Sequence, residues 1–205
     1  MTQRLGDYER ARELYGAALA LFAAVKNSEL QLYALYNMAN LDRELKDFSS
    51  GAELYEATAS LAQRIGHLDL EIGAMAGEGI CLLDMGKIDA ARVPFTALEH
   101  KMGGREQWFQ GRELVETLRI RMAAAEGRKE EALQMFDNAR ALAEVSDLYS
   151  AAWLTAACAD SLFPLDPARI RGTMQRYSRE VGALGFTDLT RKYEALQNLE
   201  PGQEA

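Results

Sequence analysis

The chain has 205 residues, 48% of them hydrophobic, only 4 prolines and a formal net charge of −8. Neither half is basic, and a protein that binds duplexes without reading sequence needs Lys and Arg to replace phosphate counterions, so the composition argues against nucleic-acid binding. The longest apolar run, residues 17–25, is shorter than the roughly 20 residues that span a bilayer, and the charged N-terminus has no signal-peptide core. We expect a cytoplasmic protein with no membrane contact.

A short motif recurs along the chain, mostly 40 or 41 residues apart. Its turn-like start lies at Gly6, Lys46, Gly86 and Gly127. A column of small residues follows at Ala11, Gly51, Ala91 and Ala132. One helical turn later comes an aromatic column at Tyr15, Tyr55, Phe95, Phe136 and Tyr177. A further apolar column holds Leu30, Leu70, Phe109, Leu148 and Leu189. A small residue lets two helix backbones approach and the aromatic fills the gap, so the pattern predicts helix pairs that bury one another.

In chain order we expect ten antiparallel helices and a disordered tail over residues 200–205. The helices are expected at residues 7–25, 28–44, 48–65, 69–84, 88–102, 106–126, 129–145, 148–162, 167–184 and 187–199. Ser28 and Gln31 fit a capping box, and Asp166 followed by Pro167 fits a helix start. Gly103-Gly104 is the clearest break.

The stretch Leu35–Leu41, followed by Lys46-Asp47-Phe48, Gly51 and Tyr55, resembles a tetratricopeptide (TPR) repeat. The resemblance covers about residues 5–185, although the period is near 40 instead of the usual 34 or so. Such long repeats are similar to those of kinesin light chains and bacterial TPR regulators. The resemblance implies an all-α, right-handed α-α superhelix, a TPR-like solenoid. The whole chain would form one domain, closed by the capping helix 187–199.

Sequence motifs for catalysis are missing. The chain contains no phosphate-binding P-loop, no HExxH, no G-x-S-x-G and no EF-hand loop. Its two cysteines, Cys81 and Cys158, have neither disulfide nor zinc spacing. The two histidines, His67 and His100, are more typical of structural positions. We therefore predict no enzymatic activity, no cofactor and no metal site.

A binding surface is the remaining possibility for function. In TPR folds the first helix of each pair lines the concave face. By this resemblance the groove is expected to contain Tyr33, Tyr36, Asn37, Asn40, Arg43, Ile80 and Arg121. An Asn that matches Asn40 can hydrogen-bond a bound peptide in that family. The basic residues of a carboxylate clamp are missing on the next lining helix. The small, apolar floor of the groove there better suits an apolar side chain or another helix. Trp108 is a candidate exposed anchor, with simple packing as the alternative.

The first helix, at residues 7–25, is apolar nearly all round, and such a helix expects cover on more than one side. Its pair helix in the repeat would lie before Met1. Three explanations stay open: a longer protein, a second copy, or an atypical cap. We therefore predict a scaffold or adaptor that binds a protein or peptide. The alternatives are a self-associating module, a homodimer through this helix, or a fragment of a larger TPR-containing regulator.

Overall fold

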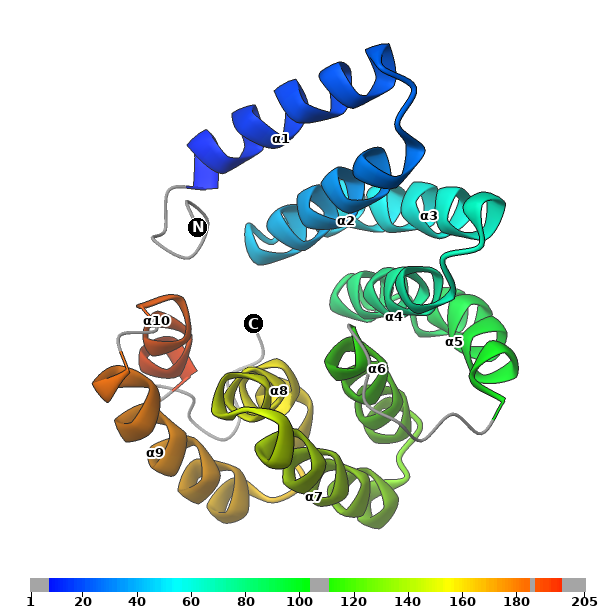
Figure 1. Ribbon diagram of the computed structural model, residues 1–205. Coiled ribbons are helices and arrows are strands. Elements are labelled where there is room, and N and C mark those ends of the chain that lie inside the picture. Colours follow the sequence, from blue (N-terminus) through cyan, green and yellow to red (C-terminus); the bar gives the residue numbers. More distant parts are fainter. Residues whose placement is uncertain (1–7, 104–110, 185–186, 197–205) are drawn as a thin grey trace. The chain divides into compact units, whose positions relative to one another are not determined.

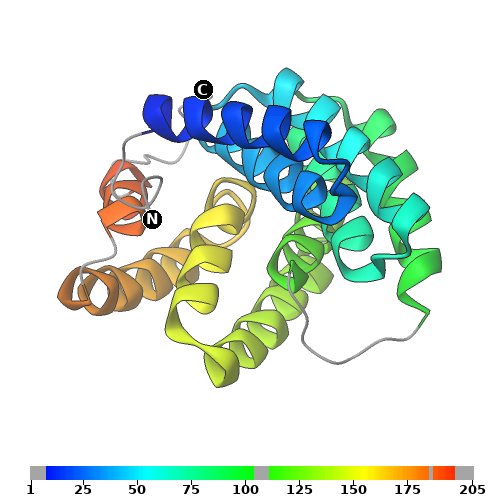
Figure 2. The ribbon, with the colours of Figure 1, turned by 45° about the horizontal axis from the view of Figure 1, so that its top comes forward.

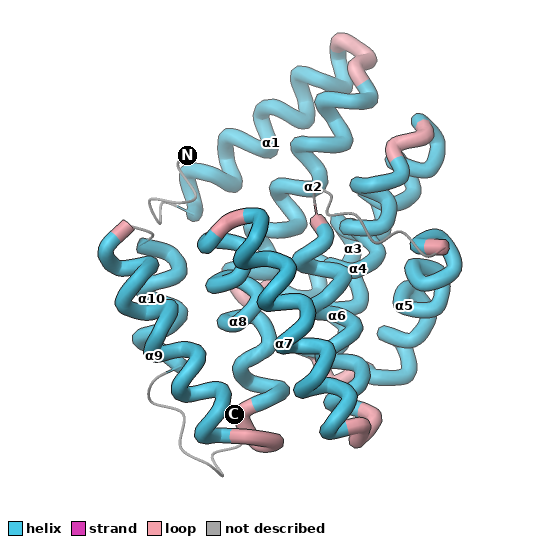
Figure 3. The backbone as a smooth tube through the Cα atoms, turned by 60° about the horizontal axis from the view of Figure 1, so that its bottom comes forward, coloured by secondary structure: helices cyan, strands magenta, loops and turns pink. Residues whose placement is uncertain are grey.

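The computed structural model describes residues 8–103, 111–184 and 187–196. Within these ranges the chain forms ten α-helices and no strand (Figures 1 and 3), which confirms the all-helical prediction. The helices are α1 (Tyr8–Ala24), α2 (Ser28–Glu44), α3 (Phe48–Ile65), α4 (Leu68–Asp84), α5 (Ile88–Met102), α6 (Arg112–Ala125), α7 (Lys129–Ser146), α8 (Leu148–Leu162), α9 (Pro167–Ala183) and α10 (Thr187–Leu196).

The helices gather into two compact units that meet within α6, between Leu118 and Arg119. In the first unit each of α1 to α4 packs against the next helix along the chain, as Figures 1 and 2 show. In the second unit α7 packs on α8, α8 on α9, and α10 on both α8 and α9. None of the helices among the described residues is both long and apolar enough to cross a bilayer.

Side-chain caps set several helix starts. Asp166 Oδ1 accepts a hydrogen bond of 3.1 Å from the Arg169 backbone N–H, which confirms the predicted start of α9. The start of α2 differs from the prediction. Its cap is Asn27, whose Oδ1 accepts from the Leu30 backbone N–H at 3.0 Å, whereas Ser28 is already helical. An Asn side chain reaches the same donor from one residue earlier and caps at least as well as Ser.

The start of the sixth helix is the largest error in the predicted bounds. The sequence pattern indicates a helix from residue 106, but α6 begins at Arg112. Gly111 directly before it has φ +93°, a left-handed conformation that ends any helix arriving from the N-terminal side. Residues 104–110 lie outside the described part of the chain, and with them the predicted anchor Trp108.

The column of small residues is buried in every repeat: Ala11 is 3% exposed, Ala91 and Ala132 are 0% exposed, and Gly51 is also buried. The aromatic column is less uniform. Tyr55, Phe136 and Tyr177 are fully buried, whereas Tyr15 and Phe95 are partly exposed. In the further apolar column Leu70 and Leu189 are buried, Leu148 is partly exposed and Leu30 is 42% exposed. Close helix approach is therefore the constant feature of the repeat.

Candidate binding surface

The hydroxyl of Tyr55 lies at the centre of a buried polar network between α2 and α3. It donates a hydrogen bond of 2.7 Å to Asn40 Oδ1 and accepts one of 3.3 Å from Arg43 Nε. Asn40 Nδ2 in turn donates to the backbone oxygen of Tyr36 at 2.9 Å. Arg43 Nη2 lies 2.9 Å from Glu44 Oε1, and the Arg43 side chain is only 9% exposed. Both ends of the Asn40 amide are thus occupied within the first unit.

Glycines on α4 make room for the two tyrosine rings. A Cβ on Gly77 would lie 2.4 Å from atoms of the Tyr55 ring, and one on Gly73 would lie 3.2 Å from the Tyr36 hydroxyl. The same hydroxyl would be 3.1 Å from a Cβ on Gly111. The rings of Tyr36 and Tyr55 meet edge to face, with centroids 6.1 Å apart. Only glycine leaves space for rings against the helix backbone.

Burial decides the charge state of this network. Because burial disfavours the phenolate, it raises the pKa of Tyr36 and of Tyr55 above the usual value, so both remain hydrogen-bond donors at neutral pH. Burial alone would lower the pKa of Arg43. The nearby Tyr55 and Glu44 raise this pKa by more than burial lowers it, so the net pKa lies above the usual range. The network is therefore a neutral Tyr–Asn pair joined to a charged Arg–Glu pair.

The TPR resemblance implies that these residues face an open groove. The structure places them differently: Tyr36 is 6% exposed and Ile80 is 1% exposed. The physical reason is the glycine pair on α4, which leaves room for the side chains of Tyr36 and Tyr55 against that helix. The expected groove side of α2 and α4 is packed with the protein's own side chains.

Two further predicted residues keep some exposure. Asn37 is partly exposed, and its side chain makes no hydrogen bond within the described residues. Arg121 belongs to the second unit, where its Nε donates to Ser161 Oγ at 3.2 Å. Within the first unit the predicted residues include the Tyr55 network and the open position Asn37 on α2. Arg121, in the second unit, contacts Ser161 on α8.

Tyr33 points to a recess at the α3–α4 turn. Its hydroxyl lies 3.2 Å from His67 Nε2, and the two rings meet edge to face at a centroid distance of 5.8 Å. His67 also caps α4, because its Nδ1 accepts from the Leu70 backbone N–H at 3.4 Å. The recess has a volume of about 610 Å³ and is lined by Ser28, Glu29, Ile65, Gly66, His67, Leu68 and Asp69. We call it the turn recess.

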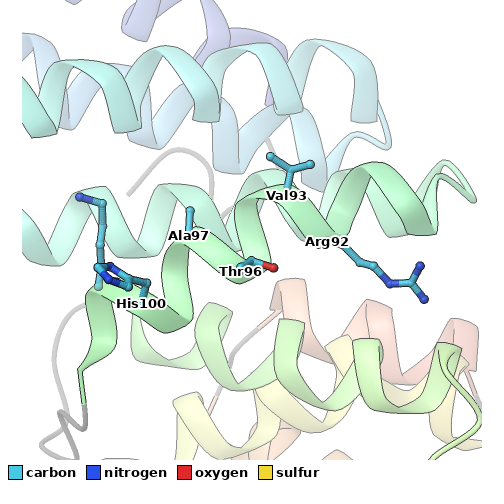
Figure 4. A pocket seen from close by; sticks show the side chains of 6 residues that line it. Arg92, Val93, Thr96, Ala97 and His100 are labelled. Carbon is cyan, nitrogen blue, oxygen red and sulfur yellow. The ribbon is translucent and has the colours of Figure 1, made fainter.

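A second hollow of about 690 Å³ follows α5 and is lined by Arg92, Val93, Thr96, Ala97, His100 and Lys101 (Figure 4). Its cations already have partners: Arg92 Nη1 lies 2.6 Å from Asp89 Oδ1, and Lys101 Nζ lies 2.9 Å from the buried Glu71 Oε1. The sequence pattern predicted neither hollow. The sequence feature that could have indicated them is a set of apolar residues outside the repeat columns, such as Val93, which is 72% exposed.

Glu78 on α4 is a half-buried carboxylate with no ion pair or hydrogen bond within the described residues. Burial and the nearby charge of Glu56 raise its pKa from 4.5 to about 7. The folded state therefore holds the proton up to a higher pH than the unfolded chain does. It follows that the contribution of Glu78 to stability is most favourable below pH 4.5, falls between pH 4.5 and about 7, and is lowest above that range.

We expect Glu78→Gln to raise the free energy of unfolding at about pH 8 by about 1–2 kcal/mol, a value reduced for solvent screening of a partly exposed group. The gain should vanish at about pH 4, where the carboxyl is protonated in both states. Urea unfolding of both proteins at the two pH values measures this. Glu53→Gln on the exposed side of α3 is the control, and an equal gain for that variant would contradict the assignment.

No protein-family model matches the chain, and no curated protein matches it at a significant level. Among the described residues, no group of three or more His, Cys, Asp or Glu is placed to hold a metal ion. Both cysteines are buried, and neither forms a disulfide. The resemblance to TPR repeats therefore rests on the residue pattern and on the buried small-residue column.

Proposed function

We propose that the protein is a cytoplasmic, TPR-like scaffold that holds a protein or peptide partner, and that its hairpins follow one another as in a right-handed α-α superhelix. The turn recess is the observation that carries the binding part of the proposal. Residues from the starts of α2 and α4 line it. His67, which also lines it, lies 3.2 Å from the hydroxyl of the predicted residue Tyr33.

The turn recess combines the two kinds of contact that protein interfaces need. Ile65 is 41% exposed and Leu68 is 40% exposed, and Leu30 near the start of α2 is 42% exposed. Ile65 and Leu68 offer an apolar floor, while Glu29 and Asp69 supply charge around it. An apolar centre with a polar rim is the usual anatomy of a recognition surface, and a clustered apolar patch on a protein surface commonly marks an interaction site.

The packed groove side of α2 and α4 supports a role away from that face. A ligand that entered there would have to break the hydrogen bonds of Tyr55 with Asn40 and Arg43, and buried polar groups that lose their partners cost about 1–3 kcal/mol each. Binding at the turn recess leaves this network intact. Asn37, whose amide makes no hydrogen bond within the described residues, is the one α2 position we assign to a polar contact.

Affinity capture from native cytosol tests the proposal when wild type and Leu68→Asp are compared. We expect proteins enriched by wild type to fall at least about fivefold with Leu68→Asp, because the new charge disrupts the apolar floor. Leu142→Asp is the matched control, because Leu142 is 39% exposed and Leu68 is 40% exposed. The same set of proteins at the same levels with all three baits would disprove this binding site.

A further inference from the structure

The outer face of α9, the orange helix of Figure 1, is basic although the protein is acidic. The exposed positions of α9 hold three arginines, one glutamine, two glycines and two alanines, and none of them is acidic. The other side of the helix is buried, and α8 and α10 pack on α9. We call the exposed side, with Arg171, Gly172, Arg176, Arg179 and Gly182, the arginine face.

The repeat does not account for this charge. Counted back six residues from the aromatic column, the exposed residue is Asp89 in α5, Glu130 in α7 and Arg171 in α9. The same position of the repeat is therefore acidic in two helices and basic in the third. A property shared by all the hairpins would have the same sign in each, so the arginine face is particular to α9.

Two of the three arginines have no acidic partner. Arg176 forms an ion pair of 3.1 Å with Glu144. Arg171 lies 5.5 Å from the centroid of the Phe163 ring, and Arg179 Nε donates to a backbone oxygen of its own helix at 3.3 Å. Neither has an ion pair within the described residues. These two guanidinium groups lie eight residues apart, which is a rise of about 12 Å along a helix.

The glycines of the arginine face have no packing role within the chain. A Cβ on Gly172 or on Gly182 would meet nothing within 4 Å, whereas one on Gly77 would overlap the Tyr55 ring. Glycine is less favourable than alanine inside a helix, so the fold itself does not explain these two. A glycine on an open helix face lets the backbone of another chain approach closely.

We propose that the arginine face binds an acidic segment of a partner protein. Carboxylates of that segment pair with Arg171 and Arg179, and its backbone passes close to Gly172. A guanidinium donates two parallel hydrogen bonds to a carboxylate, which makes arginine well suited to this contact. A helical partner needs acidic residues about two turns apart to reach both arginines.

The composition of the face selects this partner over two other anionic ones. A membrane surface calls for large apolar side chains that insert beside the cations, and the exposed positions of α9 offer only alanine, glycine and glutamine there. A nucleic acid calls for a basic field over many phosphates, and this chain has a formal net charge of −8. Two arginines at a fixed spacing fit a few discrete carboxylates.

Fluorescence anisotropy with the full chain tests the proposal. The probe is a labelled helical peptide of about 20 residues, built from alanine with glutamate at every fourth position, and the same peptide with glutamine in place of glutamate is its control. We expect a dissociation constant of about 10–100 µM for the glutamate peptide, weakened further by salt. Arg171→Glu and Arg179→Glu should each raise it at least about fivefold.

Matched variants separate the site from general charge. Arg64→Glu makes the same change at an exposed arginine of α3 that has no ion pair within the described residues, and it should change the dissociation constant less than about twofold. Gly172→Leu should weaken binding by blocking close approach. Gly16→Leu is its control, because a Cβ on Gly16 also meets nothing within 4 Å. Circular dichroism melts establish that the variants fold.

Three results would overturn the proposal. One is equal binding of the glutamate and glutamine peptides, or of neither. Another is an equal loss of affinity with Arg64→Glu and Arg171→Glu, which would show attraction to net charge alone. The third is tighter binding of duplex DNA or of phosphatidylserine vesicles than of the glutamate peptide. The turn recess is tested separately, because Leu68→Asp should leave peptide binding unchanged.

Discussion

Replacing Tyr55 with alanine is expected to lower the free energy of unfolding by about 3–5 kcal/mol, the usual range for emptying a packed aromatic site. Tyr55 is fully buried, and its ring contacts the backbone surface that Gly77 leaves open. Its hydroxyl also holds Asn40 and Arg43. The variant therefore creates a cavity and removes one hydrogen bond from each of two polar side chains in the same place.

Tyr55→Phe separates these two effects. It keeps the ring and removes only the hydroxyl, so we expect a loss of about 1–3 kcal/mol from the unsatisfied buried groups. Tyr15→Ala is the matched control, because Tyr15 occupies the same repeat column but is partly exposed. Urea unfolding followed by circular dichroism measures all three variants. A loss for Tyr55→Ala no larger than that for Tyr15→Ala would mean that the network does not stabilise the first unit.

The repeat and most helix bounds could be predicted because the information is local. A small residue followed one turn later by an aromatic fixes the phase of a helix, and the four small-column positions are all buried as expected. Capping residues predict where helices begin, as Asp166 does for α9. Where a turn depends on left-handed backbone, the pattern is weaker. Gly111 looked like one more residue within a helical stretch, yet its φ is +93° and α6 begins only at Arg112.

The candidate site was harder to predict because it depends on distances between helices. Asn40 and Ile80 lie at positions that face a groove in TPR repeats, which this sequence resembles, and their own sequence context is consistent with that role. In the structure Ile80 is buried and the Asn40 amide is held by Tyr55 and Tyr36. Gly77 and Gly73 on α4 leave the room that the tyrosines of α2 and α3 occupy. The turn recess combines residues as far apart as Ser28 and Asp69, and no local pattern connects them.

The apolar character of the first helix was visible in the sequence, but its meaning was not. The sequence left a longer protein, a second copy and an atypical cap as equal explanations. The structure adds the exposure of Leu21 beside the burial of its repeat counterpart Leu61. The leucine that α3 buries at this repeat position is therefore exposed in α1.

Gly77→Ala is expected to destabilise the first unit by about 1–3 kcal/mol or somewhat more, the usual cost of overpacking a core. The added Cβ would lie 2.4 to 2.6 Å from three atoms of the Tyr55 ring, and the hydroxyl of this ring is held by the hydrogen bonds to Asn40 and Arg43. An alanine in a helix interior normally gains about 1 kcal/mol over glycine. The clash must therefore cost more than this gain for Gly77→Ala to lower the free energy of unfolding.

Gly16→Ala is the matched control, because Gly16 lies inside α1 and a Cβ there would meet nothing within 4 Å. This variant should stabilise the protein by about 0.5–1 kcal/mol through propensity alone. A double-mutant cycle then isolates the clash. In the Tyr55→Ala background the ring is gone, so Gly77→Ala should become neutral or stabilising, with a coupling of about 1–3 kcal/mol. If Gly77→Ala has the same effect with and without the ring, α3 and α4 do not approach one another as closely as the glycine at this position indicates.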